Sequence, residues 1–257
     1  MKRLWSSMNI AFSMYSRLPA AQCDWSDDNM KYVMCFFPWI GLVIGALCFG
    51  WNALASWLGL EGPLRTVILM LIPVAVSGGI HLDGLLDTAD AMSSWRPREK
   101  RLEILKDSHA GAFAVIACAV YFFLLYGVLD LVRGELVNIY VFSFIVSRSL
   151  SGFSVVTFPK ASANGTVAGF SKSAETRVIL TVELFYLLLC VVAMVLLQPL
   201  YGAAALAGAM FTFLWYHRMA MKHFGGINGD LAGCFLSVCE MAMPLAAVVI
   251  SLISGKL

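Results

Sequence analysis

Long apolar runs, separated by shorter polar segments, dominate this chain. Seven of them are long enough to cross a bilayer as helices, which takes roughly 20 residues. The runs cover residues 33–57, 64–80, 111–131, 137–158, 178–197, 200–216 and 233–253. Helices satisfy their own backbone hydrogen bonds in lipid, so the pattern predicts an all-α, polytopic membrane bundle. We expect about seven transmembrane helices in a single integral-membrane domain, residues 1–257.

A shorter periodic pattern precedes the first apolar run. Leu4, Met8, Phe12 and Tyr15 recur at helical spacing, and polar residues occupy the positions between them. An amphipathic helix of this kind lies in the membrane interface rather than across it. The sequence therefore predicts an N-terminal interfacial helix.

Charged residues are few and unevenly distributed. They make up 13% of a chain that is 60% hydrophobic, whereas a soluble domain has about a quarter. Fourteen of the 18 Lys and Arg residues precede the first run or follow the second, fourth or sixth run. Because cytoplasmic loops carry the excess of positive charge, the N-terminus and these loops are expected in the cytoplasm. The net charge of +2 argues against a nucleic-acid partner.

The first candidate for chemistry is HLDGLLDTAD, residues 81–90, directly after the second apolar run. On a helix, Asp83, Asp87 and Asp90 fall within roughly 60° of one another. Three carboxylates so close repel unless a cation or protons neutralise them. Carboxylate oxygens suit Mg²⁺ or Mn²⁺, so we expect a metal site that holds a diphosphate. A solvated helix N-terminus is the alternative, and it explains one or two of the aspartates.

The second candidate is GGINGD, residues 225–230, where several glycines surround Asp230. A loop of this kind can wrap a phosphate or a metal, or can simply turn. Between the two acidic motifs, residues 98–111 form a short amphipathic segment that ends near Lys106 and His109. These two side chains could contact phosphate, although an interfacial helix explains most of the segment.

Ionisable residues inside the apolar runs form a third group. Arg148 is expected to face the bundle interior, where it pairs with a carboxylate or binds a phosphate. His81 is a candidate for positioning the aspartates. A cation transporter would need midplane carboxylates, and the runs offer only Glu183 and Glu240. The polar chemistry gathers on the cytoplasmic side instead, which favours an enzyme.

Three strings, in this order, then carry a family resemblance: GGIHLDGLLDTADA, EILKDSHAGAF and GGINGDLAG. They resemble cobalamin synthase, the adenosylcobinamide-GDP ribazoletransferase family. The segments SRLP and FPWIG, nearer the N-terminus, are also similar to that family. The resemblance extends over most of the chain.

The resemblance implies a multi-pass enzyme of the bacterial inner membrane with a cytoplasmic active site. It would transfer the cobinamide-phosphoryl group of adenosylcobinamide-GDP to α-ribazole or its 5′-phosphate. GMP would leave, and adenosylcobalamin or its 5′-phosphate would form, with Mg²⁺ required and Mn²⁺ as a substitute. Asp83, Asp87, Asp90 and Asp230 would bind metal, with Asp87 and Asp90 catalytic and Asp90 our choice of base. Membrane lipid is a further partner, and a second copy or another corrinoid-pathway enzyme stays open.

The substrate-binding residues implied by the motifs include three departures from the family pattern. The glycine-rich motif usually has threonine where this chain has Asn228, and arginine usually stands where this chain has His109. Lys160 is a stand-in for another arginine. The full expected set is His81, Lys106, His109, Arg148, Lys160 and Asn228. A membrane phosphotransferase of the CDP-alcohol type is the closest rival, since it would use the same metal site.

Overall fold

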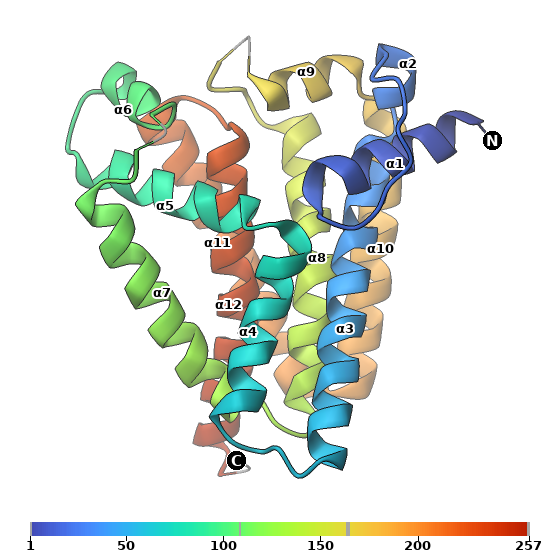
Figure 1. Ribbon diagram of the computed structural model, residues 1–257, viewed down its shortest axis with the longest axis vertical. Helices are drawn as coiled ribbons and strands as arrows, with labels where there is room; N and C mark the ends of the chain where they lie inside the picture. The colour runs from blue at the N-terminus through green and yellow to red at the C-terminus, as the bar shows by residue number, and fades with distance from the viewer. Residues whose placement is uncertain (1, 108, 163–164, 256–257) are drawn as a thin grey trace.

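The computed structural model describes residues 2–107, 109–162 and 165–255 (Figure 1). All the regular elements in these ranges are helices, and the one pairing of extended residues is an isolated bridge between Lys160 and Ile227. The all-α prediction is therefore confirmed. The helices are α1 (Lys2–Tyr15), α2 (Asp27–Met30), η1 (Val33–Phe36), α3 (Phe37–Trp57), α4 (Pro63–Ser77), α5 (Ile80–Ser93), α6 (Arg98–Ile104), α7 (Ala112–Leu131), α8 (Leu136–Thr157), α9 (Thr166–Ser173), α10 (Thr176–Leu197), α11 (Pro199–Phe224) and α12 (Gly229–Ile253).

Long apolar helices make this a membrane protein. Five in the described part of the chain are long and apolar enough to span, and the bent pair α4–α5 would be a sixth. The five are Val33–Trp57, α7, α8, α10 and α12. Helix α11 has 26 residues and runs along the bundle, but it does not belong to this group (Figure 1). The predicted count of seven spans is thus not confirmed.

The second predicted span ends earlier than the apolar pattern suggested. Helix α4 stops at Ser77 because Gly78 and Gly79 take positive φ angles of 66° and 82°. That left-handed conformation is open to glycine at little cost and ends a helix. The chain then turns by 94° into α5, which runs across the bundle rather than along it (Figure 1). The acidic motif of residues 81–90 therefore lies on a helix, as expected, at one end of the molecule.

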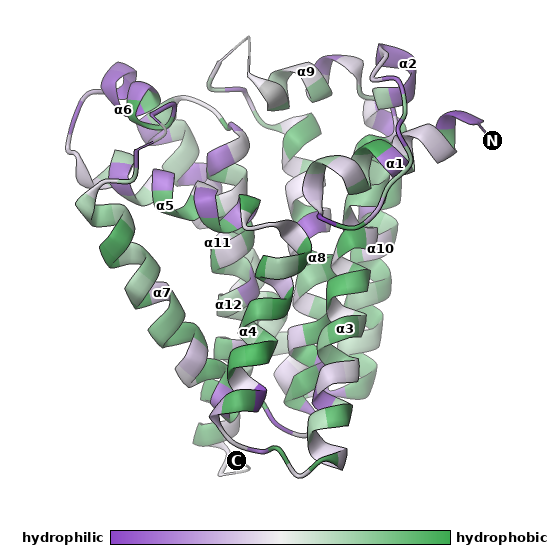
Figure 2. Ribbon diagram, in the orientation of Figure 1, coloured by the Kyte–Doolittle hydropathy of each residue, from purple (hydrophilic) through white to green (hydrophobic). Residues whose placement is uncertain are grey.

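Hydrophilic residues gather at this same end, around α1, α2, α5, α6 and α9 (Figure 2). Helix α1 is present as predicted, with Ile10 and Ala11 buried against the bundle. Leu4 and Trp5 are 49% and 59% exposed on its outer face, as an interfacial helix requires. The architecture therefore collects polar groups over one mouth of an apolar bundle.

Candidate functional site

Two glycines let α5 pack directly on the start of α12. A Cβ atom at position 84 would lie 2.5 Å from the carbonyl oxygen of Asp230. A Cβ atom at position 233 would lie 3.1 Å from the carbonyl oxygen of His81. Without side chains at Gly84 and Gly233, the two backbones approach closely. This contact brings the acidic motif of residues 81–90 beside Asp230.

The carboxylates of both motifs act on one another electrostatically. Burial, together with the negative charges of Asp83, Asp230 and Asp90, raises the pKa of Asp87 to about 6. Each of these three negative charges disfavours the ionised form of the Asp87 carboxyl group. The structure has thus concentrated four carboxyl groups at the polar end of the bundle.

The positions and hydrogen-bond partners of these carboxyl groups decide whether they fit a cation. No three of them converge closely enough to hold a metal ion as they stand, among the residues that the structure describes. Carboxylates of like charge separate when nothing lies between them. Over the described ranges, the side chains of Asp83 and Asp87 form no hydrogen bond or ion pair, so both are free to turn toward a cation. Their oxygen donors and summed charge fit Mg²⁺.

The glycine-rich loop is an ordered connection that orients Asp230. Gly225 ends α11 with a φ of 71°, and the N–H group of Ile227 donates to the carbonyl of Pro159. Asn228 then caps α12, because its Oδ1 accepts from the N–H group of Leu231 at 2.9 Å. Its Nδ2 also donates to a carboxylate oxygen of Asp230 at 2.8 Å. Asn228 therefore positions Asp230.

Asp90 has a different set of contacts from the other aspartates. Its carboxylate accepts from the N–H groups of Gly111, at 2.6 Å, and Ala114, at 2.9 Å. These amides belong to the first turn of α7, where unpaired N–H groups and the helix dipole favour a negative charge. Asp90 thus ties α5 to α7, and a base with both oxygens occupied is less free to accept a proton.

We expect Asp90→Ala to destabilise the protein by about 1–2 kcal/mol, because two amide N–H groups lose their acceptor. Asp90→Asn should lose less, since its amide oxygen still accepts one bond. Thermal unfolding in detergent, without added metal, measures the difference. Equal melting temperatures for Asp90→Ala and the parent protein would contradict this role.

The remaining expected phosphate contacts lie at the same end of the molecule. Lys106 is exposed just after α6, and His109 is exposed and paired with Asp107 at 2.7 Å. The bond from Gly111 to Asp90 brings this segment next to α5. Lys160 bridges Ile227 beside the glycine-rich loop and donates to the carbonyl of Phe158. Burial lowers the pKa of Lys160, so its ammonium lacks a compensating anion.

Arg148 pairs with a buried carboxylate, which is one of the two roles expected for it from the sequence. It is fully buried in α8, and its guanidinium lies 2.6 Å from a carboxylate oxygen of Glu240. The same oxygen accepts from Ser147 at 2.9 Å, and Arg148 also donates to the carbonyl of Phe144. The buried pair satisfies both charges inside the bundle, so Arg148 is a structural partner of Glu240.

The structure also contains a pocket beside the aspartates that was not predicted from the sequence. This Tyr15 pocket has a volume of about 190 Å³, and Asp83 and Asp230 belong to its lining. The rings of Tyr15 and Phe37 lie 4.5 Å apart at their centroids, and His81 lies within 6.4 Å of both. The SRLP and FPWIG segments were the available signal, since each lies close to one of these aromatic residues.

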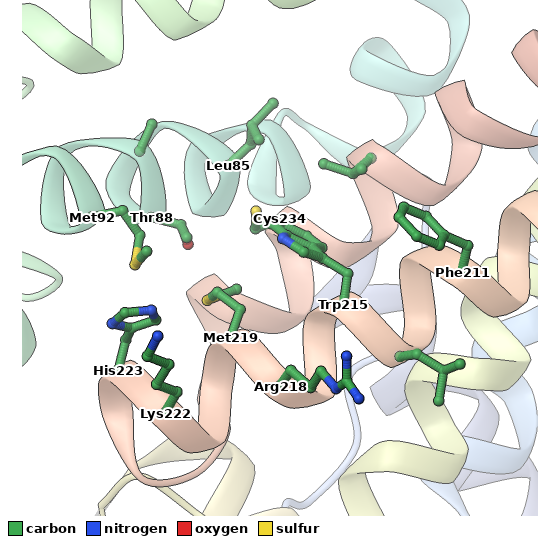
Figure 3. Close-up of a pocket in the computed structure, with 13 residues that line it drawn as sticks. Leu85, Thr88, Met92, Phe211, Trp215, Arg218, Met219, Lys222, His223 and Cys234 are labelled. Atoms are coloured by element: carbon green, nitrogen blue, oxygen red, sulfur yellow. The ribbon is translucent and has the colours of Figure 1, made fainter.

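A second and larger hollow lies on the other side of α5. This Trp215 groove has a volume of about 740 Å³ between α5, α11 and α12. Figure 3 shows Thr88 and Met92 of α5 on one side of it and Trp215 and Met219 of α11 on the other. At 100° per residue, this face of α5 points roughly 180° away from the aspartates. The groove therefore does not open onto the carboxylates.

Comparison with known proteins agrees with this combination of motifs and geometry. A model of the family described as cobalamin-5-phosphate synthase matches residues 7–248. The chain belongs to the cobalamin-5-phosphate synthase family. A relative from Lachnoclostridium phytofermentans is 42% identical over 95% of this chain and 94% of its own length. Relatives from Desulfitobacterium hafniense (35%) and Clostridium botulinum (33%) match over similar shares, and all three are named adenosylcobinamide-GDP ribazoletransferase. No solved structure matches the chain.

Membership of the cobalamin-5-phosphate synthase family confirms the resemblance inferred from the motifs. Its match covers α5, the glycine-rich loop and most of α12, so both acidic motifs are inside it. The family assignment makes this protein a transferase of cobalamin synthesis, rather than a phosphotransferase of the CDP-alcohol type or a cation transporter. Of the two midplane carboxylates a transporter would need, Glu240 is already paired with Arg148.

Proposed function

We propose that this protein is a Mg²⁺-dependent adenosylcobinamide-GDP ribazoletransferase that releases GMP. Its family and the names of its relatives support the transfer, and the acidic cluster supports the metal. The observation that carries the proposal is the rise in the pKa of Asp87 to about 6, caused partly by Asp83, Asp230 and Asp90. Crowding of like charge costs stability unless a cation offsets it. It is expected where a cation and a diphosphate bind.

Asp83 and Asp230 would hold Mg²⁺, with Asp87 within reach of both. Held there, it would supply positive charge that offsets the negative charge of the donor diphosphate and of GMP as the leaving group. Asn228 keeps Asp230 in place through its hydrogen bond, so the substitution of asparagine for the usual threonine leaves a positioning residue. Lys106 and Lys160 lie at the same end and supply positive charge toward phosphate groups, and the ring of His109 is a further hydrogen-bonding group there.

The transfer makes one bond and breaks one bond at phosphorus. A ribose hydroxyl oxygen of the acceptor bonds to the phosphorus that carries cobinamide. The bond from that phosphorus to the bridging oxygen of the diphosphate breaks, and GMP leaves with the electron pair. The hydroxyl proton goes to a carboxylate, for which we now prefer Asp87, because Asp90 already accepts two backbone bonds.

We place this site on the cytoplasmic face of the bacterial inner membrane. The positive-inside distribution of Lys and Arg residues supports that orientation, and hydrophilic residues concentrate at the end where α5 lies (Figure 2). Both nucleotide-bearing substrates would then reach the aspartates from the cytoplasm. Lipid surrounds the apolar helices below.

The test is GMP release by the purified protein. Adenosylcobinamide-GDP, Mg²⁺ and α-ribazole or its 5′-phosphate are supplied together, and GMP and the corrinoid product are followed by chromatography. We expect both products in equal amounts, and none when either the acceptor or Mg²⁺ is left out. Absence of product under conditions in which the Lachnoclostridium phytofermentans relative is active would overturn the proposal. Transfer from a CDP-activated alcohol instead would favour the rival.

A linked prediction concerns pH and metal. Because the folded protein raises the pKa of Asp87 from 3.8 to about 6, its charged form disfavours folding. The metal-free protein should therefore lose stability as pH rises from about 4 through 6, and Mg²⁺ should restore it most above pH 6. Melting temperature against pH, with Mg²⁺ or with a chelator, measures both effects. An Asp87→Asn variant should lose part of this pH dependence and keep the part that comes from Asp230, whose pKa burial also raises; an unchanged dependence would assign the titration to another group.

A further inference from the structure

The Tyr15 pocket contains the aspartates in its lining, but its chemistry is mostly apolar. Met34, Val155, Val167 and Leu236 contribute hydrocarbon from η1, α8, α9 and α12. Asp83 and Asp230 belong to the same lining, so one hollow joins an apolar interior to the reacting groups. A ligand group that enters must itself be apolar and must be attached to an atom that reaches the carboxylates.

The volume of the Tyr15 pocket limits which part of the substrates can enter it. Its volume of about 190 Å³ is below the roughly 300 to 1,000 Å³ typical of pockets for drug-sized molecules. A corrin macrocycle with its amide arms is far too large. Guanine is small enough, but its N–H and carbonyl groups would each need a partner, and the lining has few polar side chains besides the two aspartates that the proposed site assigns to Mg²⁺. A two-ring, methylated aromatic base fits both the size and the polarity.

One buried polar group in the lining has no partner. His81 is 8% exposed, and its Nε2 atom forms no hydrogen bond with the described residues. Leaving a buried ring nitrogen unpaired costs free energy, and because His81 lines the Tyr15 pocket as well as a smaller hollow beside Arg148, a ligand in the pocket can supply the missing partner. The dimethylbenzimidazole of ribazole has two methyl groups and one unsubstituted ring nitrogen, which accepts a single hydrogen bond. The faces of Tyr15 and Phe37 can contact its rings.

We infer that the Tyr15 pocket binds the benzimidazole base of the ribazole acceptor. The inference rests on the proposed function and adds to it the place of the acceptor. His81 donates to the free ring nitrogen of the base, and the aliphatic side chains surround its methyl groups. The ribose then extends toward Asp83 and Asp230, where its hydroxyl meets the donor diphosphate. The pocket thereby selects acceptors by the shape and methylation of the base.

The test combines a substitution in the Tyr15 pocket with a change in the aromatic base of the acceptor. The full-length protein in detergent is assayed with ribosides of 5,6-dimethylbenzimidazole and of benzimidazole, and kcat/KM is compared between them. The parent protein should prefer the dimethylated base by about tenfold, the usual effect of methyl groups in a fitted apolar pocket. Val155→Phe enlarges a side chain that is 5% exposed and should remove or reverse this preference. KM for adenosylcobinamide-GDP should stay within about twofold.

The ratio of two acceptors on one preparation does not depend on how much protein is folded. Val238→Phe is the matched control, because Val238 is on α12 but lines the Trp215 groove. It should leave the acceptor ratio unchanged. An unchanged ratio in Val155→Phe, with transfer still measurable, would overturn the pocket assignment alone. A raised KM for the donor with an unaltered acceptor ratio would indicate that the pocket binds the guanine of the donor. This result would also overturn the assignment of the pocket to the acceptor base. No transfer by the parent protein with either riboside would instead refute the proposed function.

Discussion

Asp87→Asn and Asp83→Asn should each lower kcat/KM by at least about a hundredfold. Even residues that only support a metal ligand cost 10–100-fold when they are changed, so a ligand or the base should cost more. The same argument applies to Asp230→Asn, and there Asn228 keeps a side chain to donate to. GMP release under saturating Mg²⁺, at several donor concentrations, measures the loss.

These variants should still fold. Removing one charge from a repelling cluster relieves the repulsion that raises the pKa of Asp87, so the metal-free Asp87→Asn protein should melt no lower than the parent. Asp28→Asn is the matched control at the same end of the molecule, because Asp28 pairs only with Arg3 and Lys31 on the exposed surface. It should keep its activity. Near-normal turnover by Asp87→Asn would move both the metal and the base elsewhere.

Arg148→Met should be the most destabilising single change that we predict. It leaves the carboxylate of Glu240 buried without its cation, and breaking a buried pair in this way costs about 3–5 kcal/mol. The hydrogen bond from Ser147 remains but carries no positive charge. The free energy of unfolding in mixed detergent and sodium dodecyl sulfate, together with the folded yield after purification, reports the loss.

A double variant separates the ion pair from a role in binding substrate. Arg148→Met combined with Glu240→Gln removes both charges and keeps an acceptor for Ser147, so most of the stability should return. Its KM for adenosylcobinamide-GDP should match that of the parent, because Arg148 is buried away from solvent. A large rise in KM with restored stability would return Arg148 to the substrate-binding residues. Arg3→Met, which breaks an exposed pair, should change stability too little to measure.

Local patterns decided which segments became helices. The apolar run at residues 33–57 was predicted with the bounds of the observed span Val33–Trp57, and the ends of α7, α8 and α10 lie within two residues of prediction. Such runs can be recognised in a sequence because side chains that face lipid are apolar. The end of α4 was misplaced, because an apolar pattern does not reveal that Gly78 and Gly79 take positive φ angles.

The sequence by itself determined the membrane class, the polar end of the bundle and the identity of the acidic residues. These depend on composition and on spacing along one helix, which are local properties. Only the tertiary structure decided how those residues divide their work. Asp90 binds the amides of α7, 21 and 24 positions away, and Arg148 meets Glu240 across 92 positions. Gly84 packs on Asp230 in the same way. Contacts between residues so distant in the chain follow from how whole helices pack, which spacing along a single helix does not encode.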